Sequence, residues 1–387
     1  MTDNVTTKKN EYRKWFLNTI VIIFVLGIFV AIVNVIVDPF FHYHAPWGKY
    51  RLYNERYIND GIARNFDYDA IIMGNSLTQN FKISQYDELF GVNGVKLPYS
   101  GANTAELWTA LGRAIGRNTA DTEIANDIPD KEYRKQYEAQ KGYNDNVSTV
   151  LICIDCDDII NEKFWVGYDS APEYLYDDNW LNDVEYLFNK DTLYKGTLFN
   201  LIMTIRGREN TSFDEYSAWE REKGPYQACA SLDMIETVNE ADSIDFTQSD
   251  KDLAELSLKY NIIPVIEANQ STRFIFVLPP FSIAKWAEYY QDGKISYRID
   301  SMYFILSELL KYDNVSIYGF DDEFDLITNL DRYCDTIHYD AEINGWMLDE
   351  IASDRHRIDG ENIDIYFQNI REFYSTYDYT LLNEFID

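Results

Sequence analysis

Five short apolar runs alternate along the chain with stretches in which apolar residues recur every three or four positions. Continuous apolar runs are typical of strands that are buried on both faces of a parallel sheet. Strands that alternate with helices predict an α/β fold, a three-layer α/β/α sandwich with a five-stranded parallel sheet. The predicted strands are Ala70–Met73, Gly94–Leu97, Val150–Ile154, Arg273–Leu278 and Val315–Phe320.

Helical spacing of apolar residues follows most of these runs. Asn103 or Thr104 is a suitable N-cap for the first such helix. The predicted helices cover about 105–117, 253–267 with an interruption at Pro264, 303–310, 341–351 and 363–374.

Two further stretches do not belong to this alternation. Residues 121–146 are charged and polar, and they predict an excursion from the sheet. Residues 157–250 are rich in acidic, amide and aromatic side chains with weak periodicity, so we expect a large, mostly helical insertion. The insertion forms either a cap over a site or an outer decoration.

The N-terminal region contains the longest apolar segment, Trp15 to Val37. Its length matches a hydrocarbon core of about 30 Å at about 1.5 Å per residue. No small-residue cleavage site follows it, so an uncleaved transmembrane signal anchor is favoured over a cleaved secretory signal. The basic residues at 8–14 predict a cytoplasmic N-terminus and an extracytoplasmic main domain. The expected organisation is a tail at 1–14, the anchor at 15–37, a connector at 38–66 and the main domain at 67–387.

Composition excludes several classes of function. The 387 residues carry a formal net charge of −31, which argues against a nucleic-acid partner. Four cysteines do not make a disulfide scaffold, and Cys153 and Cys156 lie on one predicted strand with their side chains on opposite faces. His42 and His44 have no third ligand at a suitable spacing, so packed histidines are favoured over a metal pair. The sequence therefore predicts no metal and no organic cofactor.

Candidate chemistry begins directly after the first strand, where Gly74, Asn75 and Ser76 precede a segment with helical spacing. A hydroxyl at this junction lies at the carboxyl edge of the sheet, where open α/β sheets bind ligands. Free N–H groups at the start of a helix suit a developing oxyanion. Ser76 is therefore a candidate nucleophile, and the alternative is that it only caps the helix.

A serine nucleophile needs a base and a group that orients the base. Of the four histidines, His338 follows a predicted strand and precedes a helix, as Ser76 does. Asp335 stands three residues before it, a spacing that lets a carboxylate turn back onto the imidazole. Because the residue two after Ser76 is Thr78 and not glycine, this is not the nucleophile elbow of α/β hydrolases.

These blocks resemble those of the SGNH (GDSL-like) hydrolase family, which has a flavodoxin-like fold. The resemblance rests on Gly74-Asn-Ser-Leu-Thr78, the Gly101 turn and Asp335-Thr-Ile-His338, and it spans roughly residues 67–353 without the insertion. It implies Ser76 as nucleophile, His338 as base and Asp335 as orienter. It also implies the N–H groups of Ser76 and Gly101 as oxyanion donors.

One block departs from the family pattern. The family usually carries an oxyanion-donating Asn after the third strand, and this chain has Asp155 there. An ionised carboxylate cannot donate a hydrogen bond, and loss of one donor costs about 3 kcal/mol of transition-state stabilisation. Asn103 is a candidate substitute.

The anchored layout is similar to bacterial SGNH-like proteins of polysaccharide O-acetylation and D-alanyl transfer. That resemblance implies a serine esterase or acyltransferase acting on acyl groups, acetyl above all, of a cell-surface glycan, beside a polytopic membrane-bound O-acyltransferase. The alternative is a non-catalytic glycan-binding or assembly subunit, which Asp155 favours. The intact set of Ser76, Asp335 and His338 favours the enzyme.

Overall fold

The computed structural model describes residues 2–118, 142–161, 172–177, 179–219, 226–232 and 238–385. The chain forms two compact units. Unit 1 comprises Met1–Arg51 and Pro172–Thr211, and unit 2 comprises Leu52–Ala171 and Ser212–Asp387. The predicted insertion at 157–250 is therefore divided between the units, and most of the predicted excursion at 121–146 lies outside the described residues.

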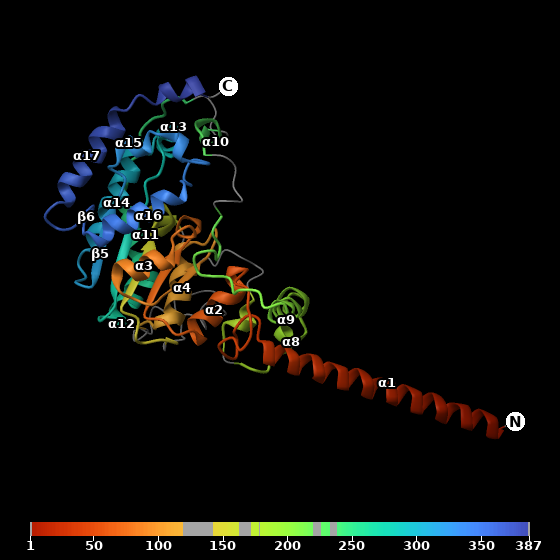
Figure 1. Ribbon diagram of the computed structural model, residues 1–387. Coiled ribbons are helices and arrows are strands. Elements are labelled where there is room, and N and C mark those ends of the chain that lie inside the picture. Colours follow the sequence, from red (N-terminus) through yellow and green to blue (C-terminus); the bar gives the residue numbers. More distant parts are fainter. Residues whose placement is uncertain are drawn as a thin grey trace. The chain divides into compact units, whose positions relative to one another are not determined.

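Unit 2 is built on a six-stranded mixed sheet with the order β2-β1-β3-β4-β5-β6 (Figure 1). The strands are β1 (Ala70–Gly74), β2 (Gly94–Pro98), β3 (Thr149–Cys153), β4 (Arg273–Leu278), β5 (Val315–Gly319) and β6 (Arg357–Ile358). Neighbours among the first five are parallel, and every bound lies within one residue of its predicted position.

The prediction of a five-stranded, purely parallel sheet is wrong at one edge. Strand β6 pairs antiparallel with β5 and makes the sheet mixed. It has only two residues, and one of them, Arg357, is exposed. A strand this short produces no apolar run, so the sequence pattern did not reveal it.

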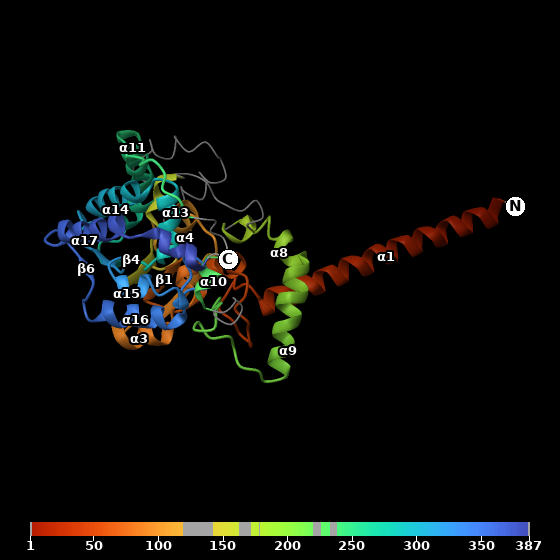
Figure 2. The ribbon, with the colours of Figure 1, turned by 90° about the horizontal axis from the view of Figure 1, so that it is seen from above.

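Helices cover both faces of the sheet (Figure 2). Helices α3 (Ile83–Phe90) and α16 (Ala341–Ala352) share a core with the strand residues Ile72 and Leu151. On the other face Trp108 of α4 (Thr104–Ile115) lies 5.8 Å from Phe276, centroid to centroid. Successive strand residues point to opposite faces, which explains why most positions of these strands are apolar.

The remaining elements of unit 2 lie at the edges and connections. Helix α2, in the predicted connector, packs against β2 and α4. The bounds of these remaining elements of unit 2 are α2 (Glu55–Asn65), η1 (Ser76–Thr78), α7 (Cys156–Asn161), α10 (Ala228–Leu232), α11 (Gln248–Ser257), η4 (Leu258–Ile262), α12 (Ile263–Ala268), α13 (Ile283–Gln291), α14 (Ile295–Leu309), α15 (Phe324–Ile327), η5 (Leu330–Arg332), α17 (Ile363–Thr376) and η6 (Tyr379–Phe385).

Unit 1 contains the predicted apolar segment as α1 (Thr2–Val37). Among the described residues, α1 is the one helix that is both long enough and apolar enough to cross a membrane, over Glu11–Val37. Near its C-terminal end lie η2 (Glu173–Leu175), α8 (Val184–Phe188), η3 (Asp191–Leu198) and α9 (Phe199–Ile205), and Figure 2 shows α8 and α9 crossing it.

The turn after α1 is organised by Asp38, which is fully buried. Its carboxylate accepts hydrogen bonds from the backbone N–H groups of His42, Tyr43 and His44 at 2.7–3.0 Å and from the Tyr186 hydroxyl at 2.6 Å. The imidazoles of His42 and His44 contact protein oxygens, which agrees with packed histidines.

Candidate active site

Ser76 lies where β1 passes into η1, at the carboxyl edge of the sheet. Strand β1 lies between β2 and β3, so the order of the strands reverses beside it. Open α/β sheets place ligands at such a switch point. The turn requires glycine at Gly74, whose φ is +154° and where an added Cβ would lie 2.5 Å from the Thr78 side chain. Asn75 caps the turn through its side chain, so Ser76 is not the N-cap.

The three predicted triad residues meet in the structure. Ser76 Oγ lies 2.6 Å from His338 Nε2. On the other side of the imidazole, His338 Nδ1 lies 2.6 Å from Asp335 Oδ2. The predicted geometry is therefore confirmed, with the carboxylate behind the imidazole and the imidazole beside the hydroxyl.

Asp335 is held by its own loop. Its Oδ1 accepts hydrogen bonds from the backbone N–H groups of Ile337 at 3.0 Å and His338 at 2.7 Å. Burial raises the pKa of Asp335, but the His338 imidazole and these two amides together outweigh burial and lower the pKa to about 2. Asp335 is consequently ionised at neutral pH and fixes the orientation of the imidazole.

Trp219, in the predicted insertion, is a site residue that the sequence reasoning missed. Its indole Nε1 donates a hydrogen bond to the Ser76 carbonyl at 2.9 Å, and its ring meets the His338 imidazole edge-on at 5.2 Å. Its backbone N–H donates to the Asn80 side chain at 3.1 Å. One tryptophan thus contacts both Ser76 and His338.

Glu55 of α2 connects the turn that contains Ser76 to the loop after β2. Its carboxylate accepts hydrogen bonds from the Gln79 side chain and from the Ser100 N–H. That loop also carries Gly101, at a φ of +64° that favours glycine. Within the described part of the chain the Gly101 N–H has no acceptor, which leaves it available to an oxyanion.

Asn103 serves α4. Its side-chain oxygen accepts a hydrogen bond from the Glu106 N–H at 2.9 Å, which makes it the N-cap that the sequence offered beside Thr104. The role of Asn103 as a substitute oxyanion donor stays a prediction.

Asp155, the departure from the family pattern, belongs to an ion-pair network. Arg298 of α14, whose side chain is 3% exposed, places Nη1 2.7 Å from Asp155 and 2.9 Å from Asp157. Burial lowers the pKa of Arg298, but the charges of Asp157 and Asp155 outweigh burial, and its pKa lies well above the ordinary value. The charge of Asp155 is therefore opposed by a buried guanidinium.

Asn75 and Asp155 line the same small recess at the ends of β1 and β3. Its volume is about 10 Å³, roughly that of one water molecule. The Asn75 side-chain oxygen accepts from the Leu77 N–H at 3.1 Å, so its amide N–H groups are directed elsewhere. An amide donor thus stands beside the position where the family pattern has its Asn.

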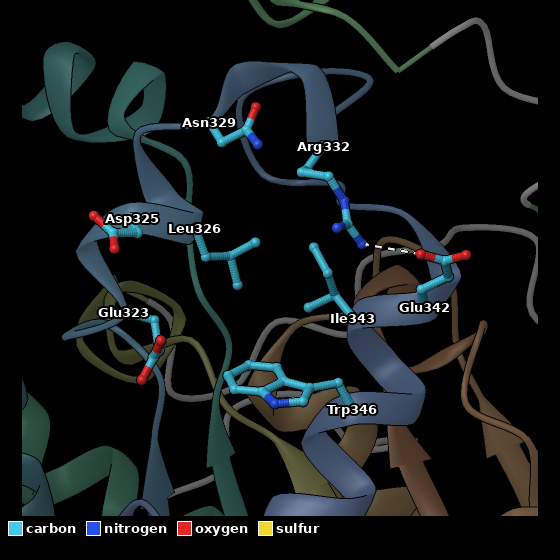
Figure 3. A pocket seen from close by; sticks show the side chains of 8 residues that line it. All are labelled: Glu323, Asp325, Leu326, Asn329, Arg332, Glu342, Ile343 and Trp346. Atoms are coloured by element: carbon cyan, nitrogen blue, oxygen red, sulfur yellow. Dashed lines mark hydrogen bonds and ion pairs between the residues drawn. The ribbon is translucent and has the colours of Figure 1, made fainter.

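A larger pocket of about 560 Å³ opens between α15, η5 and α16, on the segment that also carries Asp335 and His338 (Figure 3). Figure 3 shows Leu326, Ile343 and Trp346 in the middle and polar side chains around them. Arg332 and Glu342 form an ion pair across one side at 3.4 Å. The pocket lining is Glu323, Asp325, Leu326, Asn329, Arg332, Glu342, Ile343 and Trp346.

One group of side chains in the described residues has the composition of a cation site. Ligand atoms of Asp322, Glu323 and His356 lie within 4.8 Å of one another. The His356 imidazole also lies 3.4 Å from the Glu350 carboxylate, so it is already surrounded by acids. We assign no metal to this cluster.

Comparison with known protein families, curated proteins and solved structures gives no match for this chain. Arguments about its function therefore rest on the arrangement of the side chains and on the resemblance of the motifs.

Proposed function

We propose that unit 2 is a serine esterase or acyltransferase that acts on acyl groups, in the simplest case acetyl, of a cell-surface polysaccharide. The observation that carries the proposal is the continuous contact from Ser76 Oγ through His338 to Asp335, with both distances 2.6 Å. A serine and an Asp-His pair whose histidine lies 262 positions further along the sequence rarely meet in this order without a catalytic role.

In this mechanism Ser76 Oγ attacks the carbonyl carbon of the acyl donor while His338 Nε2 takes the hydroxyl proton. The N–H groups of Ser76 and Gly101 receive the negative charge that develops on the carbonyl oxygen. The imidazolium then protonates the leaving alcohol, and the acyl group stays on Ser76. In the second half, a sugar hydroxyl (transfer) or water (hydrolysis) loses its proton to His338 and attacks the acyl carbon of the acyl-enzyme. The bond from this carbon to Ser76 Oγ then breaks, and the imidazolium returns the proton to Ser76 Oγ.

Asp155 weakens this proposal less than its sequence position indicates. A free carboxylate near the oxyanion would oppose the reaction, but Arg298 balances the charge of Asp155 at 2.7 Å. The Asn75 amide, which borders the same recess, is the third donor in our proposal. The alternative of a non-catalytic glycan-binding subunit keeps Asp155 as its supporting observation.

The pocket beside α16 supports a carbohydrate as acceptor. Sugars bind where an aromatic surface meets a rim of amide, carboxylate and guanidinium groups, and Trp346, Asn329 and Arg332 supply these. On this proposal Trp346→Ala lowers transfer to the glycan and leaves hydrolysis of a small aryl ester unchanged.

We further propose that α1 anchors the protein in the membrane, with its N-terminus cytoplasmic and unit 2 outside the cytoplasm. The basic residues before α1 support this orientation. A polytopic membrane-bound O-acyltransferase is the proposed source of acyl groups.

The decisive test is Ser76→Ala, with Ser84→Ala on α3 as the matched control. Release of acetate from an aryl acetate should fall by about 10⁴-fold or more in Ser76→Ala and stay at the wild-type level in Ser84→Ala. The acyl content of the cell-surface polysaccharide should change in the same variant. A wild type no faster than Ser76→Ala in both assays would favour the non-catalytic subunit.

A further inference from the structure

Unit 1 exposes an apolar face on the helices that follow residue 180. Leu181, Val184, Phe188, Leu198, Ile202 and Ile205 form this face, and each is between 38% and 83% exposed. They recur at intervals of three or four residues, from Leu181 just before α8 into α8 and again along η3 and α9, which places them on one side of each helical stretch. A contiguous apolar face of this kind on a water-soluble surface is unfavourable.

The opposite side of the same helices buries polar and small residues together with Tyr186 and Met203. Thr192, Thr197 and Asn200 are at most 4% exposed. The Thr197 hydroxyl donates to the Asn34 side chain of α1 at 2.7 Å, and the Asn34 amide donates to the Leu187 carbonyl at 2.6 Å.

Small residues allow the close approach of these elements. A Cβ added at Gly196 would lie 2.6 Å from the Pro39 ring, and one added at Gly27 of α1 would lie 3.9 Å from the Phe188 ring. Polar and small residues between helices with apolar residues outside are the pattern of helices packed in lipid. The arrangement is the reverse of a water-soluble helix pair.

Unit 1 also differs from unit 2 in its net charge. Its two segments contain ten acidic and ten basic residues, so the whole formal charge of −31 belongs to unit 2. Outside the predicted cytoplasmic tail, residues 38–51 and 172–211 contain eight acidic and six basic residues, and a net charge of −2 is repelled only weakly by anionic lipid headgroups. Arg206 and Arg208, directly after α9, are exposed and suit lipid phosphates.

We propose that residues 180–205 lie in the membrane interface, with the apolar face toward the lipid acyl chains. This gives the protein a second membrane contact that does not span the bilayer. The continuous helical run from Asp191 to Ile205 has 15 residues and a length of about 22 Å, too short for a hydrocarbon core of about 30 Å. Helices α8 and η3 contact α1, and in this proposal the exposed apolar residues of α1 belong to the same lipid-facing surface. The proposal rests on the membrane anchoring by α1 that is part of the proposed function.

The test uses the full chain, reconstituted into phosphatidylcholine–phosphatidylglycerol vesicles, with Cys229 and Cys334 replaced by serine. An environment-sensitive fluorophore is attached to one introduced cysteine at a time. Ile205→Cys reports the apolar face, and Phe24→Cys reports the middle of α1. Ile365→Cys on α17 of unit 2 is the matched control, since Ile205 and Ile365 are both exposed helical isoleucines, at 83% and 62%.

The expected result is quenching of the Ile205 label by nitroxide lipids and little quenching by aqueous iodide, with the reverse at Ile365. Quenching of Ile205 by iodide alone, while the Phe24 label is quenched by lipid, overturns the interfacial contact and leaves the anchor intact. A Phe24 label in water overturns the anchor itself. An Ile205 label shielded from both quenchers means that a second copy of the chain covers the face, and this also overturns the proposal.

Discussion

Unit 1 and unit 2 differ in the surface that their helices expose. Unit 2 encloses residues such as Ile72, Trp108 and Phe276 between its helices and its sheet, and it carries the whole net charge of −31. Unit 1 encloses Asn34 and Thr197, exposes Ile205, and is electrically neutral. An exposed apolar helix face beside a helix of membrane length supports our proposal that lipid surrounds part of unit 1, whereas the charged surface of unit 2 is typical of a domain in water.

The largest expected effect on this comparison comes from Asp38→Ala in unit 1. The change leaves three buried N–H groups and the Tyr186 hydroxyl without their acceptor, which costs roughly 3–5 kcal/mol. Trypsin should then cut at Arg206 and Arg208 in detergent much faster than in the wild type. Asp38→Asn keeps one carbonyl oxygen and should lose less. An equal loss of esterase activity in both variants would contradict the independence of the two units.

Lys96 tests how completely unit 2 excludes water. Its ammonium donates to the carbonyls of Gln79 and Phe81, at 2.5 Å and 3.2 Å, and burial lowers its pKa to about 7. An unfolded lysine keeps its proton up to a pH of about 10.4, so between pH 7 and 10 the unfolded state binds more protons. The unfolding free energy should therefore rise with pH, by at most about 1.4 kcal/mol per unit.

Urea denaturation between pH 7.5 and 9.5 measures this slope. The Lys96→Met variant should lack it, and the difference between the two proteins removes contributions from other titrating groups. Equal slopes in wild type and variant would show that Lys96 keeps an ordinary pKa, and hence that water reaches it.

Asp155→Asn examines the network next to the nucleophile. It removes one of the two carboxylates that face the buried Arg298, which should lower the stability of unit 2 by about 2 kcal/mol. The esterase rate should not increase, because Arg298 already balances the charge of Asp155. Asp157→Asn is the control and should destabilise to a similar extent. A faster Asp155→Asn enzyme would instead mean that the carboxylate opposes the oxyanion.

Trp219→Phe gives the smallest expected effect. It keeps an aromatic ring beside His338 and removes only the hydrogen bond to the Ser76 carbonyl, worth about 1 kcal/mol. The turnover rate on an aryl ester should fall about fivefold, with little change in KM. Trp219→Ala also removes the ring contact and should fall further. A shift in KM alone would assign Trp219 to substrate binding.

The apolar pattern was sufficient for much of unit 2. Most residues of the five parallel strands are apolar, because a strand covered on both faces buries both of its sides, although β2 carries the buried Lys96 and β5 carries Ser316. The junction after the first run predicted Ser76, and the local spacing of Asp335 and His338 predicted their pairing. Ser76 was predictable because it follows the first run directly, and His338 because Asp335 stands three residues before it and a predicted helix follows it.

Other features depend on contacts between distant residues that no local pattern records. The two residues of β6 form a strand only because β5 offers them an edge. Trp219 reaches Ser76 across 143 positions of sequence, and Arg298 reaches Asp155 across 143 as well. A single tryptophan or arginine forms no periodic pattern, so the sequence does not predict its partner.

The sequence by itself determined five of the six strands, the membrane-length helix and the order of the proposed catalytic motifs, since each depends on neighbours within a few residues. Only the tertiary structure decided that residues 172–211 fold with the N-terminal helix and not with the domain that surrounds them in the sequence. It also decided which side of those helices is buried. Apolar periodicity identifies the apolar side of a helix, but whether protein or another medium covers that side depends on what the rest of the chain brings against it.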